Sequence, residues 1–330
     1  MQSRPRLTKK PKYTIAIPVH NRLEYLKQAI RSSLAQTVSD FEVVISDDCS
    51  TDDLGSVVNS FNDPRILYHR SEQRLGAARN HQLSVALSHG DYIVNLHSDD
   101  LLFPTYLEVA GHALDTCGEG AAVYSSMACL SGSKITGWNS VPKIRFANRE
   151  VYLENLWLEK FHNTAPTCCL FRSSAFQRIG GYGVSVRFAY DWELFMRFMN
   201  IGGGVLFLPD ILSVYRIHAG QATQTVSVQG LYDVLDLWQL KEYAHWPSSD
   251  IADLVFTVLS IAVRSGSDWV DVIEQIRRSG LALRVLRGLP RAVVNKALRK
   301  VRLSARGDNN YESPANLESA LRTAGSLIRN

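Results

Sequence analysis

Strand-like and helix-like segments alternate along the first 130 residues of this 330-residue chain. The strand-like runs are rich in β-branched and apolar residues and span 13–19, 41–48, 91–96 and 121–130. Between them, apolar residues recur at helical spacing in the segments 21–36, 77–88 and 105–115. Strands that alternate with helices of this length form right-handed βαβ units. The order therefore predicts an α/β fold with a mainly parallel sheet flanked by helices.

The sequence predicts that the chain has three parts. Asn21 has the residue type of an N-cap for the first helix, with Glu24 at position N3. The later segments favour helices at 150–159 and 191–204 and strands at 167–172 and 204–218. Beyond about residue 226 only helix-like segments follow. We therefore expect a basic N-terminal tail (1–12), an α/β domain (13–225) and an α-helical C-terminal region (226–330).

Polar residues directly follow three of the predicted strands. The first strand is followed by Pro18, His20 and Asn21, the second by Asp47, Asp48, Ser50 and Asp52, and a later one by His97, Asp99 and Asp100. In open α/β sheets, ligands bind outside the carboxyl ends of the strands. We therefore expect the three polar clusters to converge on one edge of the sheet.

Composition favours a globular protein of the reducing cytosol. Apolar residues make up 45% and charged residues 21% of the chain, which are ordinary globular values. Its 5 cysteines are scattered and contain no CxxC pair, so neither a disulfide framework nor a zinc site is indicated. No apolar run reaches the roughly 18 residues that a membrane span needs, and the run after the basic N-terminus is too short for a signal peptide.

Most of the candidate residues allow a structural and a functional interpretation. Asp99 and Asp100 suit the first turn of a helix, or they bind a hard divalent cation together with phosphate oxygens. The stretch SDDCSTDD (46–53) suits a turn, or one of its carboxylates accepts a hydrogen bond from a pyrimidine ring N–H. Arg79 is either a solvated helix cation or a bidentate partner of a diphosphate.

Two residues later in the chain leave the same choice open. Asp191 lies at the start of an amphipathic segment, where an N-cap or first-turn acid is common and a general base is rarer. His218, in the stretch SVYRIHAGQAT, favours a structural role when it is considered alone.

Taken in order, six segments resemble the family 2 glycosyltransferases, which have the Rossmann-like GT-A fold. The segments are TIAIPVHNR, FEVVISDDCSTDD, RLGAARN, GDYIVNLHSDDLLFP, GGYGVSVRFAYDWELFMRF and VYRIHAGQAT. They span roughly residues 12–224, about two thirds of the chain. Six ordered segments are far more specific than any one of them.

The resemblance implies a role for each candidate residue. In that family the segment after the first strand binds the nucleotide, which corresponds here to Pro18, His20 and Asn21. By the same resemblance Asp48 contacts uracil, Arg79 approaches the base and diphosphate, and Asp99 holds the ribose. Asp100 then binds the metal, His218 reaches the metal or diphosphate, and Asp191 is the catalytic base.

These roles imply a metal-dependent inverting transferase. Mn²⁺ or Mg²⁺ stabilises the leaving diphosphate as a Lewis acid, and the base takes the proton from the attacking hydroxyl. The sequence departs from the family pattern at two positions, since His97 stands where a DxDD arrangement has an acid and Tyr190 precedes Asp191 in place of the usual acid. Because His97 replaces an acid, the set of metal ligands at this position differs from the family pattern.

Other classes fit less well. The chain has no QxxRW motif, which counts against processive synthases, and no GxGxRxxPxT pattern, which counts against sugar nucleotidyltransferases. We expect transfer of one sugar from a nucleotide-sugar donor to a glycan or lipid-linked acceptor in surface polysaccharide, lipopolysaccharide or other glycoconjugate assembly. The alternative is an inactive GT-A module that binds nucleotide or glycan in an assembly complex. The sequence leaves the oligomeric state open.

Positive charge is concentrated at the two flanks of the chain. Residues 1–12 hold five Arg or Lys, and residues 277–306 hold ten, with no acid in either segment. Without these charges the net charge of +4 becomes −11 for the remainder. The segment 277–306 also interleaves apolar residues, so it either packs on the catalytic domain or lies on an anionic membrane surface at the inner face of the membrane. Nucleic-acid binding is a weaker interpretation because no nucleic-acid motif accompanies the cations.

The membrane interpretation makes a direct prediction. Removing residues 277–330 should abolish co-sedimentation of the protein with anionic lipid vesicles, because the basic amphipathic segment supplies the attraction. Equal sedimentation of the truncated and full-length chains would exclude this role for the segment.

Overall fold

The computed structural model describes residues 9–118, 120–139, 144–146, 168–183, 190–201, 204–221, 274 and 277–278. The described residues up to Ala219 form one compact unit, and those from Gly220 onward belong to a second. The predicted helix at 150–159, the boundary near residue 226 and most of the basic segment 277–306 lie outside the described residues. Within the described part, no helix has the length and hydrophobicity to cross a membrane.

The first half of the unit alternates strands and helices as predicted. Its elements are β1 (Tyr13–Val19), α1 (Leu23–Leu34), β2 (Phe41–Asp47), α2 (Leu54–Ser60), β3 (Ile66–Arg70), α3 (Ala77–Ala86), β4 (Tyr92–Asn95), β5 (Leu101–Leu102) and α4 (Tyr106–Thr116). The second half contains β6 (Ala122–Ser131), β7 (Lys134–Asn139), β8 (Ile144–Phe146), β9 (Leu170–Arg172), α6 (Ser173–Arg178), α7 (Tyr190–Asn200) and β10 (Val205–Ile217).

The strands form one mixed sheet with the order β3-β2-β1-β4-β9-β6-β10-β5. Strands β3, β2, β1 and β4 are mutually parallel, and β9 is antiparallel to both β4 and β6. Strands β7 and β8 pair antiparallel with β6 and β10. Strands β6 and β10 also pair in parallel, whereas β5 is antiparallel to β10. The α/β prediction is confirmed.

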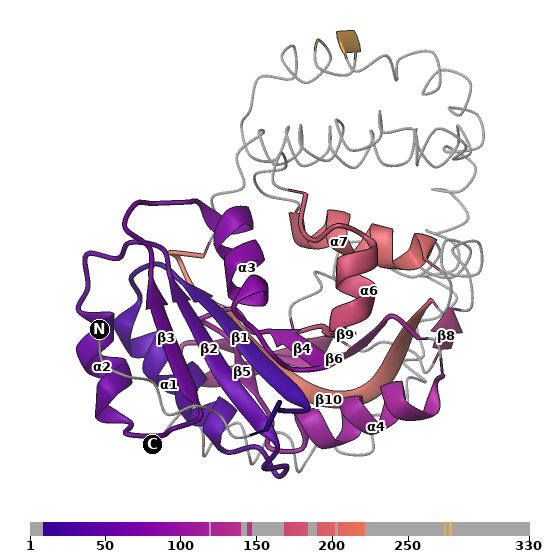
Figure 1. Cartoon of the computed structure of the whole chain (residues 1–330), viewed down its shortest axis with the longest axis horizontal. Coiled ribbons are helices and arrows are strands. Elements are labelled where there is room, and N and C mark those ends of the chain that lie inside the picture. The colour runs from indigo at the N-terminus through magenta and orange to yellow at the C-terminus, as the bar shows by residue number, and fades with distance from the viewer. Residues whose placement is uncertain are drawn as a thin grey trace. The chain divides into compact units, whose positions relative to one another are not determined.

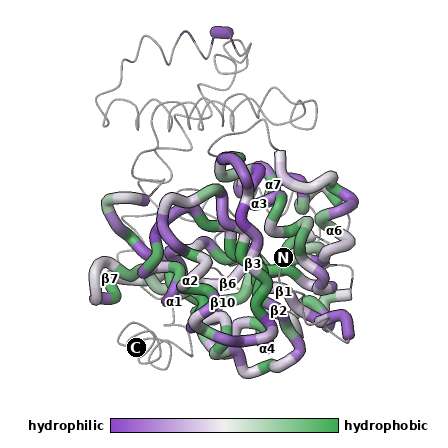
Figure 2. Tube along the Cα trace, turned by 60° about the vertical axis from the view of Figure 1, so that its left-hand side comes forward, coloured by the Kyte–Doolittle hydropathy of each residue, from purple (hydrophilic) through white to green (hydrophobic). Residues whose placement is uncertain are grey.

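Helices cover both faces of the sheet, with α3 and α7 on one side and α4 on the other (Figure 1). Every residue of β1 and of β2 is therefore buried, as expected for interior strands of a parallel sheet. Ile15, Ile17, Val43 and Ile45 have no exposed surface and form the centre of the core. Figure 2 shows the same central strands as hydrophobic segments, with hydrophilic turns around them.

One close approach fixes how α3 connects to β4. A Cβ placed on Gly90 would lie 2.6 Å from the backbone nitrogen of Thr14 and 2.7 Å from the carbonyl carbon of Tyr13. The Gly90 nitrogen also donates a hydrogen bond to Thr14 Oγ1 at 2.9 Å. Since the nearest atoms belong to the backbone of β1, they cannot move without disturbing the central strand.

Gly90→Ala should therefore destabilise the fold. We expect the free energy of unfolding to fall by about 1–3 kcal/mol, the usual cost of overpacking, as measured by urea denaturation. Gly137→Ala is the matched control, because a Cβ there would meet no atom within 4 Å. Equal stabilities of the two variants would contradict the proposed close approach.

Candidate functional site

The carboxyl ends of β1, β2 and β4 meet at one edge of the sheet, as predicted. The Asp48 backbone nitrogen donates to Val19 O at 2.8 Å, and His20 Nδ1 lies 2.9 Å from Asp48 O. The guanidinium of Arg22, which follows β1, pairs with Asp99, which follows β4. The three polar clusters expected from the sequence therefore lie together.

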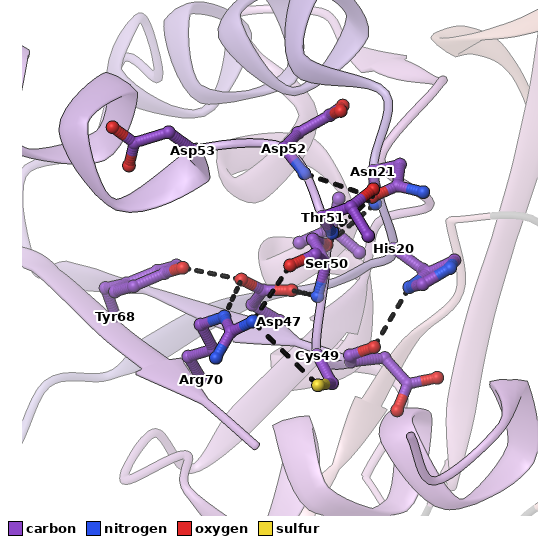
Figure 3. A network of polar contacts seen from close by, with 12 residues as sticks. His20, Asn21, Asp47, Cys49, Ser50, Thr51, Asp52, Asp53, Tyr68 and Arg70 are labelled. Atoms are coloured by element: carbon purple, nitrogen blue, oxygen red, sulfur yellow. Dashed lines mark hydrogen bonds and ion pairs between the residues drawn. The ribbon is translucent and has the colours of Figure 1, made fainter. Parts of the chain in front are cut away.

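The turn after β1 has an unusual backbone. Asn21 and Arg22 are consecutive residues in the left-handed region, with φ of 57° and 66°, a conformation that costs a non-glycine residue on the order of 1 kcal/mol. The N-cap of α1 is Arg22, not Asn21 as predicted. The Asn21 side chain instead accepts hydrogen bonds from Thr51 N at 2.9 Å and Thr51 Oγ1 at 3.1 Å (Figure 3). It binds the neighbouring loop, not its own helix.

Asp47 and Asp48, at the end of β2, fix the surrounding loops through hydrogen bonds. Asp47 is fully buried and accepts hydrogen bonds from Tyr68 OH at 2.6 Å and Ser50 N at 2.9 Å (Figure 3). The Asp48 carboxylate accepts from the backbone nitrogens of Leu75 at 2.5 Å and Gly76 at 3.1 Å. Asp48 thereby fixes the loop that leads into α3.

The acids after β4 have different environments although they are adjacent. Asp99 Oδ2 contacts His218 Nε2 at 3.1 Å and pairs with Arg22. Burial raises the pKa of Asp99, but His97, Arg22 and His218 outweigh this effect, so its pKa lies below the usual value. Burial and the neighbouring Asp99 charge together raise the pKa of Asp100 well above its usual value.

Asp100 leaves one buried acceptor atom without a donor. Its Oδ1 accepts from Arg216 N at 2.9 Å, whereas Oδ2 has no hydrogen-bond partner among the described residues. The residue is only 1% exposed, and an unsatisfied buried carboxylate oxygen is costly. A cation beside this oxygen would remove that cost.

His97, Asp99 and Asp100 form a group that fits a divalent metal. One ligand atom from each lies within 4.8 Å of the others, and His97 Nδ1 is 3.9 Å from Asp100 Oδ2. Carboxylate oxygens suit Mg²⁺ or Mn²⁺, and an imidazole nitrogen suits a divalent transition metal. The histidine that departs from the expected DxDD pattern therefore lies where an additional ligand is useful. His218 contacts this group through Asp99.

The Tyr25 ring of α1 packs against Arg216 and His218 at the end of β10. The Arg216 guanidinium lies 4.7 Å from the Tyr25 ring centroid, and the His218 ring lies 4.8 Å from it. Arg216 also donates to Asp99 O at 2.7 Å and to Gln28 Oε1 at 2.6 Å. Tyr25, Arg216 and Arg22 were not singled out from the sequence, because nothing local links them to Asp99.

The remaining predicted residues surround this centre. Pro18 lies within β1 and pairs in register with Ser46 of β2, and Arg79 is exposed in the first turn of α3. Asp191 lies in the first turn of α7. Burial raises the pKa of Tyr190, and the neighbouring Asp191 charge raises it further. The Tyr190 ring packs 4.8 Å from the ring of His81 on α3. The His81 ring centroid in turn lies 5.3 Å from that of His97. These rings therefore connect the start of α7 to the group of His97, Asp99 and Asp100.

A model of the glycosyl transferase family 2 matches residues 14–180, just over half of the chain. The chain belongs to this family. An uncharacterized glycosyltransferase of Rickettsia prowazekii is 27% identical over 69% of this chain and 70% of its own length. The putative colanic acid biosynthesis glycosyl transferase WcaA of Escherichia coli is 26% identical over 66% of this chain and 76% of its own length.

Solved structures agree on the GT-A fold of this glycosyltransferase. S. aureus TarS 1–349 in complex with UDP-GlcNAc superposes with a TM-score of 0.62 at 18% identity, covering 91% of this chain and 93% of TarS 1–349. The mannosyltransferase PcManGT of Pyrobaculum calidifontis, in complex with GDP-Man and Mn²⁺, has a TM-score of 0.51 at 16% identity and covers 98% and 87%. The fold prediction is therefore confirmed.

His81 makes the stability of this glycosyltransferase depend on pH. Its Nδ1 lies 2.9 Å from Ala77 O, and burial together with the nearby His97 lowers its pKa from 6.5 to about 3. The unfolded chain therefore binds more protons than the folded one between these values. The free energy of unfolding contributed by His81 is complete above pH 6.5 and is lost as the pH falls toward 3.

We expect His81→Gln to reduce the acid sensitivity of the fold. Between pH 7 and pH 5 the wild type should lose about 2 kcal/mol more unfolding free energy than the variant, as measured by urea denaturation at each pH. His112→Gln, on the exposed face of α4, is the control and should behave like the wild type. A wild-type pH dependence in His81→Gln would show that His81 titrates normally.

Proposed function

We propose that this glycosyltransferase moves one sugar from a nucleoside-diphosphate donor, with UDP as the nucleotide, to an acceptor hydroxyl. The observation that carries the proposal is the unsatisfied Asp100 Oδ2, buried beside His97 and Asp99 where three strands end. It supports binding of Mn²⁺ or Mg²⁺ by Asp100 and His97, with His218 as a further candidate ligand. When bound, the cation stabilises the negative charge of the departing diphosphate.

The nucleotide is proposed to bind over the ends of β1 and β2. His20 and Asn21 border this edge, and Pro18 lies just before them near the end of β1. Asp99 is the candidate partner of the ribose. Asp48 already accepts two backbone hydrogen bonds, but a carboxylate offers about four lone-pair sites. It can therefore also accept a hydrogen bond from the uracil ring N–H. Arg79 is exposed on the same side and is the candidate cation for the base and diphosphate.

Asp191 is proposed as the general base. It lies in the first turn of α7. Burial and the neighbouring Tyr190 raise the pKa of Tyr182, and the Asp191 charge adds a smaller increase. Tyr182 in turn accepts a hydrogen bond from Asn95 Nδ2 at 2.7 Å, at the end of β4. Asp191 would take the proton from the acceptor hydroxyl as its oxygen attacks the anomeric carbon. A single displacement inverts the configuration at that carbon.

For the acceptor we propose a glycan or a lipid-linked glycan in surface polysaccharide assembly. The similarity to WcaA, described as a putative colanic acid biosynthesis enzyme, supports this class. A lipid-linked acceptor would suit a cytoplasmic protein that binds the inner face of the membrane through its basic segment. The alternative is a module that keeps the fold but has lost turnover.

Titration of UDP into the protein by calorimetry tests the donor site. We expect binding with Mn²⁺ and none with EDTA. Asp100→Ala should weaken it at least about 50-fold, because the loss of a metal ligand removes the charge that holds the diphosphate. Asp91→Ala, an exposed acid just before β4, is the control and should bind normally.

Other outcomes of this titration separate the parts of the proposal. Binding of GDP or dTDP but not UDP would show that the base assignment through Asp48 is wrong. Failure to bind any nucleotide would favour the inactive module. Asp191→Asn should keep UDP affinity and lose transfer, whereas retained transfer would exclude it as the base.

A further inference from the structure

Arg22 contacts the acidic group formed by His97, Asp99 and Asp100, although it follows a different strand. Its guanidinium pairs with Asp99 Oδ2, and the two side chains are only 29% and 10% exposed. The same carboxylate oxygen contacts His218 Nε2 at 3.1 Å. One oxygen of Asp99 is thus shared between a guanidinium and an imidazole, next to the unsatisfied oxygen of Asp100.

The backbone holds Arg22 in this position at a conformational cost. Arg22 and Asn21 are both left-handed, with φ of 66° and 57°. The turn is fixed by the hydrogen bond from Asn21 N to Ser50 Oγ at 2.7 Å and by those that the Asn21 side chain accepts from Thr51. A strained backbone that the surrounding structure fixes in this way is typical of functional sites.

Charge determines what Arg22 can do here. A divalent cation bound by Asp100 and His97 would lie close to the Arg22 guanidinium, because Arg22 pairs with the adjacent Asp99. The two positive charges would repel each other. A diphosphate next to the cation reverses this balance, because it brings negative charge that a planar guanidinium binds in a bidentate manner. Arg22 therefore opposes binding of the cation alone and favours binding of the cation with the nucleotide.

We propose that Arg22 couples metal binding to donor binding, by leaving Asp99 for the diphosphate when cation and nucleotide are both bound. This inference rests on the proposed function. Coupling between two ligands is reciprocal, so the nucleotide raises the affinity for the cation by the same factor as the cation raises that for the nucleotide. The pairing of Arg22 with Asp99 thus weakens cation binding when no donor is bound.

The test measures two affinities of the full-length chain. Binding of Mn²⁺ alone is followed by the electron paramagnetic resonance signal of the free ion, and binding of UDP at saturating Mn²⁺ is followed by calorimetry. In Arg22→Gln, Mn²⁺ alone should bind about 3- to 10-fold more tightly, because a competing charge is gone. UDP should bind about 10- to 100-fold more weakly, because a charge-assisted hydrogen bond is lost.

Two further variants separate charge from structure. Arg22→Lys keeps the charge, so its affinity for Mn²⁺ alone should stay within about 2-fold of the wild type while UDP affinity falls less than in Arg22→Gln. Arg31→Gln makes the same change in the exposed last turn of α1 and should alter neither affinity. Thermal unfolding of each variant checks that the fold is retained.

The inference requires both changes in Arg22→Gln, namely tighter binding of Mn²⁺ alone and weaker binding of UDP. If Arg22→Gln weakens both ligands, Arg22 is only structural, and if either affinity is unchanged, it does not couple them; each result overturns the inference. In both cases the wild type still binds UDP with Mn²⁺, so the proposed function survives. If the wild type does not bind UDP with Mn²⁺, the proposed function fails and this inference fails with it.

Discussion

The site depends on one buried arginine that joins the end of β10 to the loop after β4 and to helix α1. Arg216, at the end of β10, donates through its backbone nitrogen to Asp100 Oδ1 at 2.9 Å and through Nε to Asp99 O at 2.7 Å. Its guanidinium packs on the Tyr25 ring of α1 at 4.7 Å. Arg216 is 5% exposed, so these contacts replace its lost hydration. They hold the loop after β4, the end of β10 and helix α1 in one arrangement.

That arrangement gives two adjacent carboxylates different tasks. Arg22 and His218 share an oxygen of Asp99, so the protein itself largely balances this charge. Asp100 is buried more deeply, and its Oδ2 has no hydrogen-bond donor among the described residues. The pair therefore combines one carboxylate that is already neutralised with one that still needs a cation, next to an imidazole that can share the ion. This asymmetry supports the proposed metal site.

Much of the fold was predictable because it depends on local patterns. The runs that became β1, β2 and β4 are apolar and contain several β-branched residues, and the run that became β6 is largely apolar. Such runs are recognisable because the strands are buried in the sheet. Other elements lacked such a signal: β3 is only partly buried, and β5 consists of the two residues Leu101–Leu102. The antiparallel pairing of β9 with β4 and β6 joins segments that are distant in the chain. No local pattern specifies that pairing, so a mainly parallel sheet was expected throughout.

The sequence by itself determined that acids and amides follow β1, β2 and β4, and parallel topology then required these residues to share an edge of the sheet. The tertiary structure alone decided which of them touch. Asn21 has the residue type of an N-cap, yet the nearby Thr51 backbone draws its side chain away from α1. Arg22, Tyr25 and Arg216 meet the acidic group only through contacts between distant segments. Such contacts arise from packing through space, which the spacing of residues along a chain does not encode.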